Sequence, residues 1–160
     1  MAQDWANFAV ITGSAAGALT GLLFVAVSLN RERIAGHPAL RGQAGQTLVL
    51  FMLPLLLSIL LVLPGSASAL GTMITVLAVL AGAALLLIGS EKKPVGDDDK
   101  EDRLARLLDK ASPNLIVVVL TLVAGCLQLA GDDGLYWVAA SSVVSLVGGV
   151  VNAWLFLTRS

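Results

Sequence analysis

Residues 5–29 read WANFAVITGSAAGALTGLLFVAVSL and contain no Asp, Glu, Lys, Arg or His. About 20 mostly apolar residues in an α-helix are enough to cross the roughly 30 Å of hydrocarbon in a bilayer. Backbone groups in lipid have no water to bind, and a helix satisfies them within one segment. This stretch therefore predicts a membrane-spanning helix and favours an all-α membrane protein.

Further uncharged apolar stretches follow at about residues 47–63, 70–89, 113–130 and 135–157. The 160-residue chain is 57% hydrophobic and 13% charged, whereas an average soluble domain is roughly 25% charged. A soluble fold of this size has too much surface to hide so many apolar side chains. We therefore predict one domain, residues 1–160, that is a bundle of five transmembrane helices. Pro54 lies inside the second stretch and is expected to kink that helix, because it lacks a backbone donor.

The ten Lys and Arg residues all fall on one side of this five-span arrangement, in residues 30–46, residues 90–112 and the carboxyl-terminal tail. The connectors on the other side carry acidic residues only, Asp4, Asp132 and Asp133. Basic residues concentrate in cytoplasmic loops, so the amino terminus is expected outside and the carboxyl terminus in the cytoplasm.

A glycine repeat runs along the first span, with Gly13, Gly17 and Gly21 each four residues apart. This spacing puts the three glycines on one helix face, where a second backbone can approach closely. We expect this face to pack against another helix. The spacing leaves open whether that helix belongs to the same chain.

Two spans also carry stripes of uncharged polar residues. The stripes contain Asn7, Ser14 and Ser28 in the first span, and Ser141, Ser145 and Asn152 in the last. Such a face either hydrogen-bonds to neighbouring helices or lines a wet pore. The spans contain no charge, which argues against proton-coupled transport but not against a channel with an uncharged filter.

Residues 90–112 are the soluble-looking part of the chain. A short amphipathic cytoplasmic helix is expected at about residues 98–111, because Leu104, Leu107 and Leu108 then share one face. This face is a candidate docking surface for a protein partner or for the membrane. Anionic lipid headgroups are the expected contacts of three arginines, Arg31, Arg33 and Arg41.

Catalytic and metal-binding patterns are missing from the sequence. It has no nucleophile elbow, no H-E-x-x-H and no phosphate-binding glycine loop. The single His37 and the single Cys126 give no metal-ligand set and no disulfide. A net charge of −1 provides no basic excess for nucleic acid. We therefore expect no enzyme activity, no cofactor, no metal and no nucleic-acid partner.

Residues 13–34, GSAAGALTGLLFVAVSLNRERI, resemble a segment near the start of an uncharacterised family of small bacterial multispanning membrane proteins. The resemblance covers the first span and the segment that follows it. It implies a location in the bacterial inner membrane, and it carries over no activity and no functional residue.

Two functions are compatible with these patterns. The first is a non-catalytic membrane subunit or assembly factor that packs through the glycine face and engages a partner through the cytoplasmic segment. The alternative is a homo-oligomeric channel in which the polar faces of the first and last spans line a pore. The expected partners are the lipid bilayer and either further copies of the chain or a larger membrane complex.

Overall fold

The computed structural model describes residues 2–90 and 112–158, and these ranges contain α-helices and no strand. The helices are α1 (Ala2–Leu29), α2 (Arg31–Gly36), α3 (Pro38–Val62), α4 (Ala67–Ser90), α6 (Ser112–Ala130) and α7 (Leu135–Thr158). The all-α fold class is thus confirmed for the described ranges. Residues 98–111, where the amphipathic helix is expected, lie outside them.

Four of these helices are long and apolar enough to cross a membrane. Their qualifying segments are Trp5–Leu29, Leu40–Val62, Ala67–Ile88 and Leu135–Leu155. The apolar segment of α6, Asn114–Ala130, is shorter. The chain is therefore compatible with a membrane-embedded protein.

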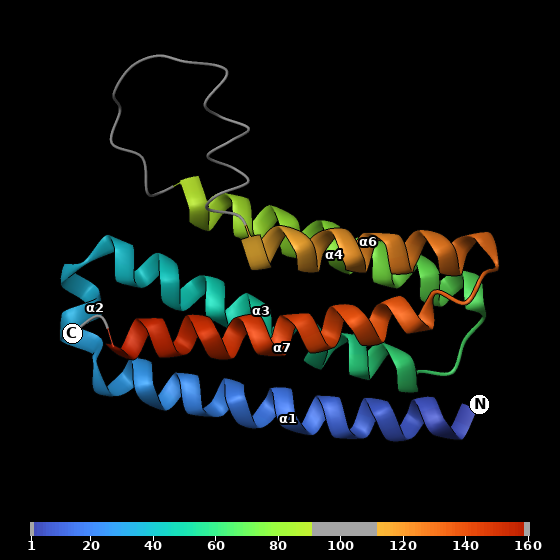
Figure 1. Cartoon of the computed structure of the whole chain (residues 1–160), viewed down its shortest axis with the longest axis horizontal. Helices are drawn as coiled ribbons and strands as arrows, with labels where there is room; N and C mark the ends of the chain where they lie inside the picture. The colour runs from blue at the N-terminus through green and yellow to red at the C-terminus, as the bar shows by residue number, and fades with distance from the viewer. Residues whose placement is uncertain (1, 91–111, 159–160) are drawn as a thin grey trace, which may run out of the picture.

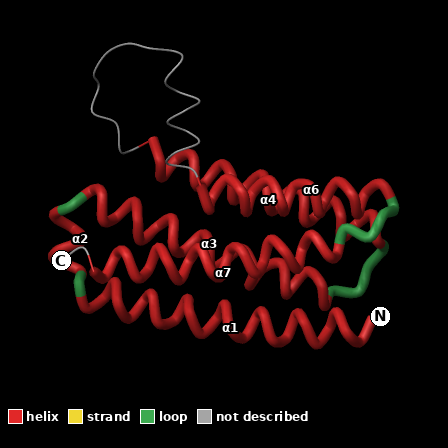
Figure 2. Tube along the Cα trace, viewed as in Figure 1, coloured by secondary structure: helices red, strands yellow, loops and turns green. Residues whose placement is uncertain are grey.

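The long helices lie side by side, and successive ones run in opposite directions (Figures 1 and 2). α3 is the most connected helix, because it packs against α1, α4 and α7. α6 packs against α4 and α7, whereas α1 packs mainly against α3. As a result α1 forms one flank of the bundle and the α4–α6 pair forms the other (Figure 1).

The region between the first two spans differs from the prediction. The uncharged apolar stretches predict a loop over residues 30–46, between the first two spans, but the structure has α2 there, followed by the first turns of α3. Pro38 occupies the first turn of α3, where its missing N–H costs nothing and its fixed φ favours the helix. The loop prediction is wrong because hydropathy marks where a helix becomes apolar and not where it begins.

The bundle buries many small residues beside large ones such as Phe51 and Leu57, and it exposes many large apolar side chains. Ala16, Ala78, Ala124 and Ser145 are fully buried. Large side chains such as Ile11 on α1 are exposed. Lipid solvates such a surface well, and small interior residues let helix backbones approach closely.

Candidate functional site

The glycine face of α1 is divided between an internal contact and the exterior. A Cβ added at Gly13 would lie 3.1 Å from Cβ of Ser58 in α3, and one at Gly17 would lie 3.9 Å from Cδ1 of Leu55. A Cβ at Gly21 would meet nothing within 4 Å. The structure thus places Gly13 and Gly17 against α3 of the same chain and leaves Gly21 open.

The polar stripe of α1 lies on its outward side. Asn7, Ser14, Gly21 and Ser28 are all exposed, at intervals of seven residues along the helix. Ile11, next to this stripe, is 70% exposed. A repeat of seven residues keeps one helix face aligned with a partner helix in a left-handed pair. This outward face, which we call the α1 stripe, is therefore suited to contact another helix.

The polar stripe of α7 lies inside the bundle. Ser141 and Ser145 are fully buried. The hydroxyls of Ser141 and Thr121, which lies in α6, are hydrogen-bonded at 3.2 Å. Ser145 Oγ donates to the backbone carbonyl of Leu50 in α3 over 2.6 Å. These serines therefore join α7 to two neighbouring helices.

Asn152 is the third polar position on α7 and is half-buried. Its backbone carbonyl accepts a hydrogen bond from Nε2 of Gln43 in α3, over 3.5 Å. The contact lies at the end of the bundle where α3 begins and α7 ends (Figure 1). Asn152 thus belongs to the α3–α7 interface, together with Ser145.

Close helix contacts also occur at glycines that the sequence does not single out. A Cβ added at Gly125 of α6 would overlap Oγ1 of Thr75 in α4 and come within 2.9 Å of its backbone N. A Cβ at Gly71 of α4 would lie 2.9 Å from the backbone N of Leu129. Gly71 and Thr75 are four residues apart, as are Thr121 and Gly125. This spacing of small residues was a usable signal for the α4–α6 contact.

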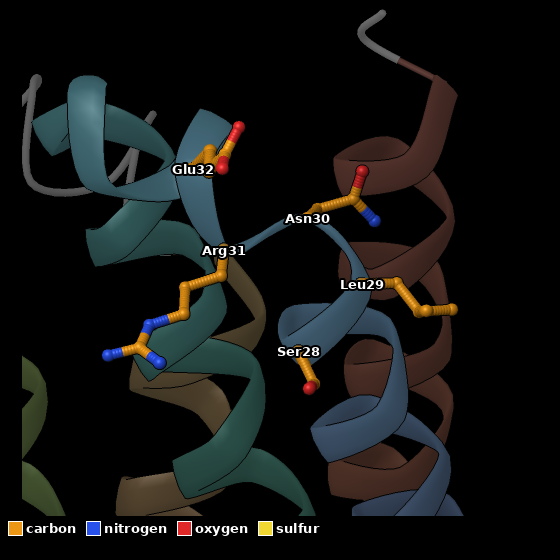
Figure 3. Close-up of a pocket in the computed structure, with 5 residues that line it drawn as sticks. All are labelled: Ser28, Leu29, Asn30, Arg31 and Glu32. Atoms are coloured by element: carbon orange, nitrogen blue, oxygen red, sulfur yellow. The ribbon is translucent and has the colours of Figure 1, made fainter.

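The arginines expected at headgroups lie near one end of the bundle. The side chains of Arg31 and Arg41 are exposed, and the side chain of Arg33 is not described. Among the described residues, a hollow of about 440 Å³ is lined by Ser28, Leu29, Asn30, Arg31 and Glu32. These side chains point in different directions (Figure 3). The hollow therefore lacks a set of polar groups that converge on one ligand position.

The remaining predicted positions add no chemical centre. Leu104, Leu107 and Leu108 lie outside the described ranges. Within those ranges, no group of three or more His, Cys, Asp and Glu residues could hold a metal ion. Cys126 is exposed on α6. The described residues at the predicted positions thus form contacts between helices and the outward α1 stripe.

Comparison with known proteins gives no match to a family model, to a curated protein or to a solved structure.

Proposed function

We propose that the protein is a non-catalytic integral membrane protein that acts as a subunit or assembly factor through helix packing. The observation that carries the proposal is the α1 stripe, in which Asn7, Ser14, Gly21 and Ser28 face outward. Lipid tails are as apolar as leucine, so helices associate through close packing and hydrogen bonds. Small and polar residues on an exposed membrane helix supply both.

The proposal includes five membrane crossings, with the amino terminus outside and the carboxyl terminus in the cytoplasm of a bacterium. The 17-residue apolar segment of α6 is at the lower end of the range for a span, about 17–25 residues. Its antiparallel packing against α4 and α7 supports a fifth crossing (Figure 2). α2 and the start of α3, which carry Arg31 and Arg41, lie at one end of the bundle, and the turn from α6 to α7, which carries Asp132 and Asp133, lies at the other (Figure 1), which supports this orientation.

A bulky substitution in the α1 stripe tests the proposal. Ala18, beside Ser14 and Gly21 on this face, is exposed, and so is Ala83 on α4. Ala18→Leu should abolish the association of the chain with further copies or with a partner protein. Ala83→Leu should leave that association intact. The measurement is the mass of the detergent-solubilised particle, by light scattering after size-exclusion chromatography. A wild-type protein that is strictly monomeric in mild detergent and in native nanodiscs would contradict the proposal, as would association that survives Ala18→Leu.

A homo-oligomeric channel is the second candidate, and the same stripe favours it. Asn7, Ser14 and Ser28 extend along most of α1, so a ring of copies could surround an uncharged polar lumen with this helix. Ser141 and Ser145 are bonded within the bundle, so α1 would supply the lining. The channel requires a ring of identical subunits and ion or solute flux through proteoliposomes that Ser14→Leu blocks. Recovery of the protein as one copy in a larger complex excludes the channel and supports a subunit.

A further inference from the structure

Pro54 interrupts the hydrogen bonding of α3. In an α-helix the amide of residue 54 would donate to the carbonyl of residue 50, but proline has no N–H. α3 nevertheless runs through Pro54 without a break, from Pro38 to Val62. Pro54 and Leu50 are both buried. The carbonyl of Leu50 therefore loses its usual helical donor, and leaving a buried carbonyl unsatisfied is costly.

Ser145 of α7 takes the place of that donor. Its Oγ lies 2.6 Å from the carbonyl oxygen of Leu50, although the two residues are 95 positions apart in the chain. We propose that Pro54 and Ser145 form a latch, in which proline frees the carbonyl of Leu50 and docking of α7 satisfies it. This inference is independent of the proposed function, because it concerns contacts inside one chain.

Phe51, the residue after Leu50, fixes the position at which α7 docks on α3. A Cβ added at Gly149 would overlap Cε1 of the Phe51 ring, so the ring fits only where α7 has a glycine. Ser145 and Gly149 are one helical turn apart, and they meet Leu50 and Phe51, which are consecutive. A shift of α7 by one turn in either direction would replace Gly149 by Ser145 or Ala153 and place a larger side chain on the ring. The latch therefore specifies a single docking position.

A matched pair of serine substitutions tests the latch. Ser142 lies on the same helix as Ser145 and is 1% exposed, but its hydroxyl has no hydrogen-bond partner. Ser145→Ala should lower the equilibrium constant for folding about 3- to 20-fold, the range of interhelical hydrogen bonds in membranes. Ser142→Ala should leave it unchanged or raise it. Reversible unfolding in mixed micelles measures both, and equal losses would overturn the latch.

The dependence on Pro54 separates the latch from an ordinary hydrogen bond. In the Pro54→Ala background, the new amide can donate to the carbonyl of Leu50 within α3. In that background, Ser145→Ala should change the logarithm of the equilibrium constant for folding by less than half as much as it does in the protein with Pro54. An undiminished effect in the Pro54→Ala background would contradict the proposal.

Carbonyl NMR gives a readout that does not require unfolding. Leucine is followed by phenylalanine at Leu23–Phe24, Leu50–Phe51 and Leu155–Phe156. Labelling with carbonyl-¹³C leucine and ¹⁵N phenylalanine therefore restricts the HNCO spectrum to these three pairs. Ser145→Ala should move the carbonyl resonance of Leu50 upfield, because a hydrogen bond to a carbonyl carbon deshields it, and Ser142→Ala should not. An unmoved Leu50 resonance in a folded Ser145→Ala protein would overturn the latch.

Discussion

The structural role of a glycine in this bundle depends on the atoms that face it. Gly125 faces the backbone of Thr75, Gly149 faces the ring of Phe51, and Gly21 faces open space. In the first two cases the missing Cβ permits the helix contact. In the third case it leaves the outward face of α1 smooth. The same residue type therefore supports the internal packing at two positions and the exposed stripe at another.

Alanine substitutions should separate these roles. Gly125→Ala forces a Cβ against Thr75 and should lower the free energy of unfolding by about 1–3 kcal/mol, the usual cost of overpacking. Gly21→Ala meets nothing within 4 Å, so it should leave the stability of a single chain unchanged or slightly raised. Unfolding in mixed micelles measures both, and a Gly125→Ala protein as stable as wild type would disprove the close approach of α4 and α6.

At the residue scale, the sequence predicted which residues share a helix face better than it predicted which neighbouring helix those residues touch. The four-residue spacing of Gly13 and Gly17 places both on one side of α1, and α3 packs there. The spacing could not reveal that Gly21 faces outward, because it does not say how much of this helix face α3 covers. It also could not distinguish Ser145, which bonds Leu50, from Ser14, which is exposed. Both are serines on apolar helices, and only the neighbouring helix differs.

At the scale of the helix, apolar stretches without charge located each long helix. The four stretches that qualify as spans, and the shorter one in α6, overlap the five that the sequence predicts. The boundaries were less accurate, because α3 begins at Pro38, before its apolar core. α4 begins near Ser66, whose Oγ accepts a hydrogen bond from the amide of Ala69 over 3.2 Å. Local capping of this kind sets helix ends, and hydropathy does not register it.

α6 is the helix whose membrane crossing most needs a direct test. Val119 lies near the middle of α6 and is 48% exposed. In a Cys126→Ala background, Val119→Cys should resist a membrane-impermeant maleimide, because lipid covers an exposed side chain at the centre of a span. Asp133→Cys, in the exposed turn after α6, is the control that should react. Rapid labelling of both cysteines in intact and in opened vesicles would contradict five crossings.

At the scale of the whole molecule, the helices form an up-and-down bundle with connections at its two ends. The connection from α3 to α4 lies at the end where α1 begins, and α2 lies at the other end (Figure 1). Charge sorting in the sequence predicts the same alternation, since all ten Lys and Arg residues fall in every second connector and in the carboxyl-terminal tail, whereas the other connectors hold acidic residues or no charge. What charge could not predict is the order of neighbours, in which α3 contacts α1, α4 and α7. That order depends on small residues and hydroxyls inside the bundle.

Cysteines introduced at two glycine positions would report which end of the bundle lies on which side of the membrane. Gly36 and Gly65 are exposed, and an added Cβ at either meets nothing within 4 Å. In the Cys126→Ala background, Gly65→Cys should react with an impermeant maleimide added to intact spheroplasts. Gly36→Cys should react only after the cells are opened. The reverse pattern would invert the orientation, and reaction of both from the same side would exclude an odd number of crossings between them.

The bond from Ser145 to Leu50 also has a consequence for how the protein is made. Ribosomes add about 5–20 residues per second, so the 95 positions that separate these residues take roughly 5–20 s to synthesise. During that interval α1 and α3 can already pair, but the carbonyl of Leu50 lacks the hydrogen bond that Ser145 of α7 later donates to it. The nascent chain therefore carries an unpaired polar group in α3 until α7 has been made.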